Sequence, residues 1–217
     1  MALLGGVLGL DTVSCVQAMV SRPIVAAPIA GYLLGDPAAG MSAGVVLELI
    51  SLNQLPIGAN RGWDTAPASI AAAAVAALSS GGAVTLVVAV GFGVLVGWVG
   101  GWTVHLMRHA IARLVAAGES QRPIAASVLS ARHLSAMAID FARAAVLTLV
   151  ALLLGAPLAS GFEFSGAAAA VAATMLVLIC VGLALGSDMR MMAKGRTVVM
   201  AFTVGLLVSA VLSLWLV

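Results

Sequence analysis

The chain alternates long apolar runs with short polar segments, and four of the runs are long enough to cross a membrane. They cover residues 81–107, 136–159, 166–186 and 197–217. A helix of about 20 apolar residues spans the roughly 30 Å of hydrocarbon in a bilayer. Only the run 136–159 contains charged residues, Asp140 and Arg143, in its first turns. The four runs therefore predict four transmembrane helices.

The first 78 residues have a different pattern, because no uncharged apolar run in them reaches the length of a span. Charged side chains interrupt the apolar pieces, and so do proline and glycine residues: Pro23, Pro28, Gly35, Pro37, Pro56, Gly58, Gly62 and Pro67. Irregular backbone at membrane depth is tolerated only where it is buried in protein or lines a cavity. This pattern predicts broken helices or re-entrant hairpins of the kind found in transporters.

Composition supports a membrane protein, with 63% apolar and 8% charged residues and a mean hydropathy of +1.19. Soluble domains carry about 25% charged residues. The apolar runs lack the alternation of a membrane β-barrel. The predicted fold is an all-α integral membrane protein, a multi-span helical bundle with two parts. Residues 1–78 form the broken-helix region with the candidate site, and residues 79–217 hold the spans.

Basic residues predict the orientation, because cytoplasmic loops carry an excess of Lys and Arg. They gather in the segment 108–134 and again at 190–196, before the last run, so both segments are expected in the cytoplasm. The segment 109–134 is either an amphipathic helix on the inner membrane surface or a solvated linker. The loop 160–165 and the carboxy terminus are then expected outside. The net charge of +2, without aromatic residues among the basic ones, gives no indication of nucleic-acid binding.

Candidate chemistry is sparse. Cys15 and Cys180 lie in apolar surroundings without metal-ligand spacing, which favours small core residues and no metal. The sequence contains no GxxxxGK[ST], HExxH or GxSxG motif, and no histidine lies near a candidate nucleophile. We expect no cofactor and no catalytic residue in this chain alone.

Two carboxylates in the first third are candidate binding residues, because ionisable groups at membrane depth are costly and usually functional. Glu48 and Asp64 flank a segment with the amides Asn53 and Gln54. Carboxylates and amides together provide the acceptors and donors that sugar hydroxyls need. The alternative is a polar loop at the interface, with Glu48 capping a helix or pairing locally.

The remaining charges in apolar segments suggest structural ion pairs. Arg22 is expected to pair with Asp36 or Asp11, because an unpaired charge there would be strongly destabilising. Asp140 and Arg143 stand three residues apart, as in a local ion pair on one helix.

The first 70 residues carry a series of short motifs at characteristic spacings. These are Gly9-Leu-Asp11, Gln17-Ala-Met-Val-Ser-Arg-Pro-Ile-Val25, Leu34-Gly-Asp36 with Gly40, Leu47-Glu48-Leu, and Pro56-Ile-Gly-Ala59 followed by Asp64 and Ala68-Ser-Ile70. Ala142-Arg143-Ala and Asp188-Met-Arg-Met-Met192 extend the similarity. With these motifs the chain resembles the IIC membrane subunit of the mannose, fructose and sorbose family of the bacterial phosphoenolpyruvate-dependent sugar phosphotransferase system.

The resemblance implies a translocation unit of IIC and IID subunits in the bacterial inner membrane, assembled as trimers of IIC–IID pairs. The sugar binds inside and moves with a mobile core, and the soluble proteins IIA and IIB supply the phosphoryl group. The family's polar site corresponds here to Gln17, Glu48 and Asp64, with Asn53 and Gln54 as neighbours. Trp63, next to Asp64, is either a stacking surface for the sugar or an interfacial anchor.

Two other functions fit the same pattern. A non-transporting accessory or scaffold subunit of a membrane complex would keep the fold without the sugar, and a small-solute channel would need only the broken hairpins. Only the transporter reading requires a IID partner and docking of IIB on the cytoplasmic loops.

Overall fold

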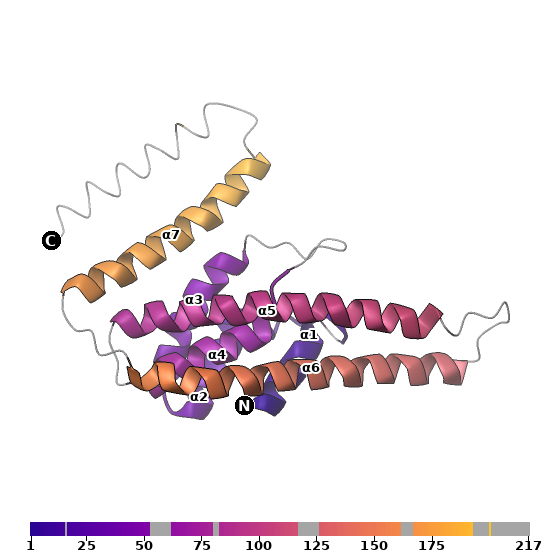
Figure 1. Ribbon diagram of the computed structural model, residues 1–217. Coiled ribbons are helices and arrows are strands. Elements are labelled where there is room, and N and C mark those ends of the chain that lie inside the picture. Colours follow the sequence, from indigo (N-terminus) through magenta and orange to yellow (C-terminus); the bar gives the residue numbers. More distant parts are fainter. Residues whose placement is uncertain are drawn as a thin grey trace.

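The computed structural model describes residues 1–15, 17–52, 62–79, 83–116, 126–161, 167–192 and 200, and within these ranges α-helices joined by turns and loops make up the chain (Figure 1). In chain order the helices are α1 (Ala2–Val13), α2 (Pro23–Leu34), α3 (Pro37–Ser51), α4 (Thr65–Leu78), α5 (Ala83–Ala116), α6 (Ala126–Gly161) and α7 (Ala167–Met192). The described part contains no strand, which agrees with the predicted fold class.

The first third consists of four short helices, as the proline and glycine pattern predicts. Helices α1 to α4 have 12 to 15 residues, which at about 1.5 Å per residue is about 18 to 23 Å. None of them alone reaches across roughly 30 Å of hydrocarbon.

Helices α2 and α3 form a tight hairpin, and the residues at its turn are ones that favour this turn. Gly35 takes the left-handed φ of 93° that ends α2, Asp36 accepts a hydrogen bond from the Ala39 amide at 2.9 Å, and Pro37 begins α3. These are favoured residues at a helix C-terminus, an N-cap and a first helical position. The helices approach so closely that a Cβ on Gly31 would lie 2.9 Å from the Gly40 Cα.

The two longest helices, α5 and α6, run side by side in opposite directions (Figure 1). Within them, Thr85–Arg113 and Ala126–Ala159 are long and apolar enough to cross a membrane. They contain residues 85–107 of the predicted run 81–107 and all of the predicted run 136–159. The predicted run 166–186 forms most of α7, and the run 197–217 lies outside the described residues except for Met200.

The predicted amphipathic surface helix over residues 109–134 is wrong for the part of this segment that the structure describes. Residues 109–116 continue α5 and residues 126–134 begin α6. With 34 and 36 residues, the two helices are each about 50 Å long, well beyond the hydrocarbon thickness. The exposed Arg108 and Arg113 therefore lie on a helix end long enough to project from the membrane.

Helix α4 is the centre of the bundle. All residues from Ala66 to Ala76 are buried, and the helix packs against α1, α2, α3, α5 and α6. Alanine and glycine permit this close approach of helix backbones. A Cβ on Gly93 of α5 would lie 2.9 Å from the Ala72 Cβ, and a Cβ on Gly97 would lie 2.6 Å from the Trp63 ring. The glycine spacing in α5 thus serves packing.

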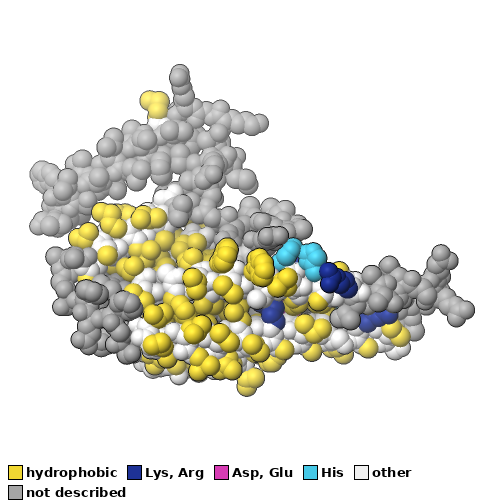
Figure 2. Space-filling view, in the orientation of Figure 1, with side chains coloured by type: hydrophobic (Ala, Val, Ile, Leu, Met, Phe, Trp, Pro, Cys, Tyr) yellow, Lys and Arg dark blue, Asp and Glu magenta, His cyan; other side chains and the backbone are white. Residues whose placement is uncertain are grey.

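Large apolar side chains cover much of the outer surface. Figure 2 shows hydrophobic side chains over most of one face, with His and Lys or Arg side chains toward the projecting ends of α5 and α6. Trp98 and Trp102 on α5 are 71% and 56% exposed, and Leu153 on α6 is 67% exposed. Soluble monomers rarely expose so much contiguous apolar surface, so lipid or other membrane subunits are the fitting surroundings.

Candidate functional site

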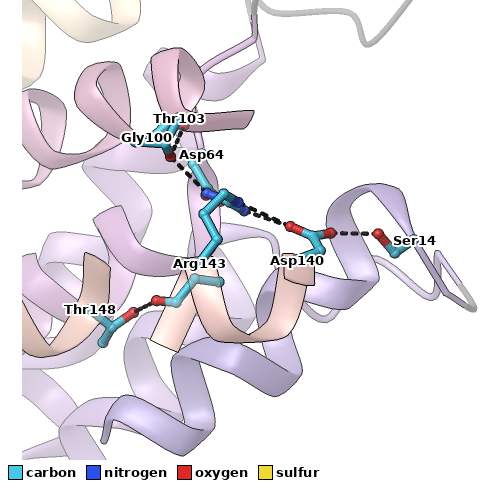
Figure 3. Close-up of polar contacts among 8 residues, drawn as sticks. Ser14, Asp64, Gly100, Thr103, Asp140, Arg143 and Thr148 are labelled. Atoms are coloured by element: carbon cyan, nitrogen blue, oxygen red, sulfur yellow. Dashed lines mark hydrogen bonds and ion pairs between the residues drawn. The ribbon is translucent and has the colours of Figure 1, made fainter. Parts of the chain in front are cut away.

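A chain of buried polar side chains crosses the bundle near the start of α4 (Figure 3). Asp64 stands immediately before α4, and its side chain is buried, with the residue 1% exposed. Its backbone N–H donates to the Gly97 carbonyl of α5 at 2.9 Å. A Cβ on Gly100 would lie 2.5 Å from the Asp64 Cβ, so the glycines of α5 make room for this carboxylate.

Arg143 reaches Asp64 from α6. Its Nη1 donates to Asp64 Oδ2 at 2.7 Å and to the Thr103 hydroxyl of α5 at 3.0 Å. Its Nε donates to Asp140 Oδ1 at 3.0 Å, one helical turn earlier. A single guanidinium therefore connects α6 with α5 and with the start of α4, using the fixed fork geometry of arginine.

Asp140 extends the chain of contacts to the loop between α1 and α2. It is fully buried, and its Oδ2 accepts a hydrogen bond from the Ser14 hydroxyl at 2.5 Å. Ser14 follows α1 directly, and three residues later Gln17 adopts a left-handed backbone with φ of 51°. Asp11 fixes this loop by accepting hydrogen bonds from the amides of Ala18 and Ser21.

Two polar atoms in the centre of this network have no hydrogen-bond partner among the described residues. They are Asp64 Oδ1 and Arg143 Nη2, although Nη2 lies 2.9 Å from Asp140 Oδ1 as an ion pair. A buried polar atom left without a hydrogen bond costs about 1–3 kcal/mol, and more when the group is charged. With two carboxylates around one guanidinium, the trio also carries excess negative charge. The site is therefore able to accept and donate further hydrogen bonds.

The partner predicted for Arg22 is wrong. Arg22 forms an ion pair with Glu48, with its Nε 2.7 Å from Glu48 Oε1. The hairpin explains this pairing, since it brings the start of α2 beside the end of α3. Asp36 lies at the turn, about 18 Å of helix away, and caps α3 instead.

The predicted site residues have different partners in the structure. Glu48 also accepts a hydrogen bond from the Ile24 amide, so it pairs locally at the open end of the hairpin. Gln17 is exposed in the loop that follows Ser14, and its backbone N–H donates to the Cys15 carbonyl. Asn53 and Gln54 lie outside the described residues. Trp63 is buried in the apolar core, which excludes an anchor exposed at the interface.

Three contacts of the network were not predicted from the sequence. Arg143 looked satisfied by Asp140 on its own helix, and its second partner, Asp64, belongs to a different part of the chain. Thr103 and Ser14 gave no signal beyond being hydroxyl residues near apolar segments. Within the described residues, no three His, Cys, Asp or Glu side chains are grouped as metal ligands.

Comparisons with known proteins agree with this architecture. A solved structure described as "Structure of membrane protein" matches with a TM-score of 0.68 and 18% identity, covering 96% of this chain and 85% of that one. A comparison with curated protein sequences gives no match. The family model for the sorbose-specific IIC component of the phosphotransferase system (PTS) matches residues 1–217. This membrane protein therefore belongs to the family of sorbose-specific IIC components, the sugar transport subunits of the phosphotransferase system.

Proposed function

We propose that this chain binds a hexose within the bacterial inner membrane and passes it to the cytoplasm, where a IIB partner phosphorylates it. The proposal includes a multi-pass topology, a IID membrane subunit as partner, and trimers of IIC–IID pairs. The family membership supports the class of function. The polar network supports a binding site inside the bundle.

The observation that carries the proposal is the unsatisfied carboxylate oxygen of Asp64. It is buried at the start of a short helix, α4, whose residues from Ala66 to Ala76 are all buried as well. A sugar hydroxyl that donates to Oδ1 would remove the cost of this unpaired acceptor. Arg143 and Thr103 hold the other side of the site, so the carboxylate is oriented before the sugar arrives.

The other predicted residues take different roles in this proposal. Gln17, Asn53 and Gln54 are neighbours that contact further hydroxyls. Glu48 is assigned to holding the hairpin of α2 and α3 together through Arg22. The chain contributes no nucleophile in this mechanism, since the phosphoryl group comes from IIB, which IIA recharges.

The test is phosphoenolpyruvate-dependent phosphorylation of labelled mannose, fructose and sorbose by inverted vesicles. The vesicles contain this chain with its IID partner and receive the soluble phosphocarriers. We expect one of the three sugars to be phosphorylated by the wild type, with most of the rate lost in Asp64→Asn. If the assembled wild type phosphorylates none of them, the proposal is wrong and an accessory or scaffold subunit becomes the better account.

A further inference from the structure

We infer that Arg143 is a second sugar-contacting residue, whose Nη2 donates to the hydroxyl group that itself donates to Asp64 Oδ1. This inference rests on the proposed function and adds to it a specificity-determining residue. It assigns Arg143 a role beyond the ion pair with Asp140 that the sequence suggests.

The two atoms without hydrogen bonds belong to two side chains that contact each other, Arg143 and Asp64. Arg143 Nη1 and Asp64 Oδ2 are 2.7 Å apart, and each has an unsatisfied counterpart on its own group, Nη2 and Oδ1. Nη2, which keeps its ion pair with Asp140 at 2.9 Å but forms no hydrogen bond, and the unbonded Oδ1 are thus a donor and an acceptor on adjoining groups. Both side chains are largely removed from solvent, with 10% of the Arg143 side chain and none of the Asp64 side chain exposed.

Arg143 Nη2 is a donor and Asp64 Oδ1 is an acceptor, and together they favour a neutral hydroxyl as the ligand. A hydroxyl has one donor and two acceptor positions, so it can satisfy both atoms at once. An anion would bind the guanidinium but would be repelled by the carboxylates, and an ammonium group would meet the opposite conflict. A carbonyl oxygen would leave Asp64 Oδ1 unpaired, because it cannot donate.

Arginine suits this task better than lysine. Nε and Nη1 are already bound by Asp140, Asp64 and Thr103, and the guanidinium is planar. The direction of the Nη2 hydrogens is therefore fixed by the other contacts. A lysine ammonium would keep the positive charge and lose this third, oriented donor.

The experiment compares binding of monodeoxy sugars. The affinity of the purified complex with its IID partner is measured for the hexose that the wild type phosphorylates, and for each analogue lacking one hydroxyl. The proteins are the wild type, Asp64→Asn and Arg143→Lys, with Ser135→Ala as a control, because that exposed hydroxyl of α6 bonds only within its own helix. Thermal melting and assembly with IID check that each variant is folded.

For the complete sugar we expect each site variant to lose about tenfold to a hundredfold in affinity, as for a hydrogen bond to a charged group. For the wild type, one deoxy analogue should bind about tenfold to a hundredfold more weakly than the complete sugar. The affinity of Asp64→Asn and of Arg143→Lys for that same analogue should be no lower than the wild-type affinity for it. If Arg143→Lys fails to assemble, the double variant Asp140→Asn/Arg143→Gln, which keeps the net charge of the trio, should give the same pattern.

The inference is overturned if Arg143→Lys binds every sugar as tightly as the wild type does. It is also overturned if Arg143→Lys still binds more weakly than the wild type to the deoxy analogue for which Asp64→Asn and the wild type have equal affinity. Either result would mean that the sugar does not contact Nη2, which would then keep only its ion pair with Asp140. An unchanged affinity in Asp64→Asn would instead refute the proposed function itself, so the two failures are distinguishable.

Discussion

At the scale of single residues, one arginine connects parts of the chain that are far apart in sequence. Arg143 joins Asp64, Asp140 and Thr103 in surroundings where a charge without a partner is costly. The need for partners was predictable from the sequence, and so was the neighbour on the same helix. The pairing with Asp64 was not, because it depends on how α6 packs against the start of α4, and no local pattern encodes that packing.

The Ser14 hydroxyl is predicted to stabilise this network measurably. In Ser14→Ala, one oxygen of the fully buried Asp140 carboxylate loses its hydrogen bond. We expect the free energy of unfolding to fall by about 1–3 kcal/mol. Thermal melting in detergent checks this, with the exposed Ser135→Ala as control at less than about 0.5 kcal/mol. Equal melting temperatures for the two variants would contradict the network.

At the scale of helices, glycine positions decide how closely α5 approaches the site. The spacing of the glycines in the sequence of α5 does not show which of them face a partner. In the structure Gly100 faces Asp64 and Leu147, whereas Gly91 faces open space. The two positions are therefore a matched pair for a test.

Gly100→Ala should destabilise the protein and Gly91→Ala should not. A Cβ at Gly100 would lie 2.5 Å from the Asp64 Cβ and 3.0 Å from Leu147 Cδ2, so α5 must shift, at about 1–3 kcal/mol. At Gly91 the same change should stabilise helix α5 by about 0.5–1 kcal/mol. We expect the melting temperature to fall in Gly100→Ala and to rise in Gly91→Ala, relative to wild type. A Gly100→Ala protein as stable as the wild type would show that the site is less tightly packed than described.

The orientation of the long helices is a separate prediction. We expect the shared end of α5 and α6 in the cytoplasm, because it carries Arg108, Arg113 and Arg132. In a Cys15→Ser/Cys180→Ala background, an impermeant maleimide should label Ala112→Cys in inverted vesicles and Ala170→Cys in intact cells. Labelling of Ala112→Cys from outside would reverse the topology.

At the scale of the whole molecule, the sequence was sufficient for the class of fold and for the broken first third. Proline, glycine and charge positions locate both ends of α2 and the starts of α3 and α4, because these residues act locally. The close hairpin, the burial of α4 and the pairing of Glu48 with Arg22 and of Asp64 with Arg143 depend on packing between distant segments, so they required the structure.

The exposed apolar surface predicts a membrane partner. Large side chains such as Trp98, Leu153 and Ile179 are more than half exposed, and the proposal assigns a IID subunit to part of this surface. Co-expression with IID should yield a complex with equal numbers of the two chains in multiples of three, measured by native mass spectrometry. Recovery of this chain alone under those conditions would argue against the partnership.

The most direct test of the account measures sugar binding by the IIC–IID complex in two variants. Each variant replaces one N-cap aspartate by asparagine. Asp64→Asn removes the carboxylate that we place against the sugar, whereas Asp36→Asn keeps a good cap at the start of α3, far from the network. We predict that Asp64→Asn weakens binding by about tenfold to a hundredfold and that Asp36→Asn binds as the wild type does. Equal affinities of the two variants would contradict the central claim.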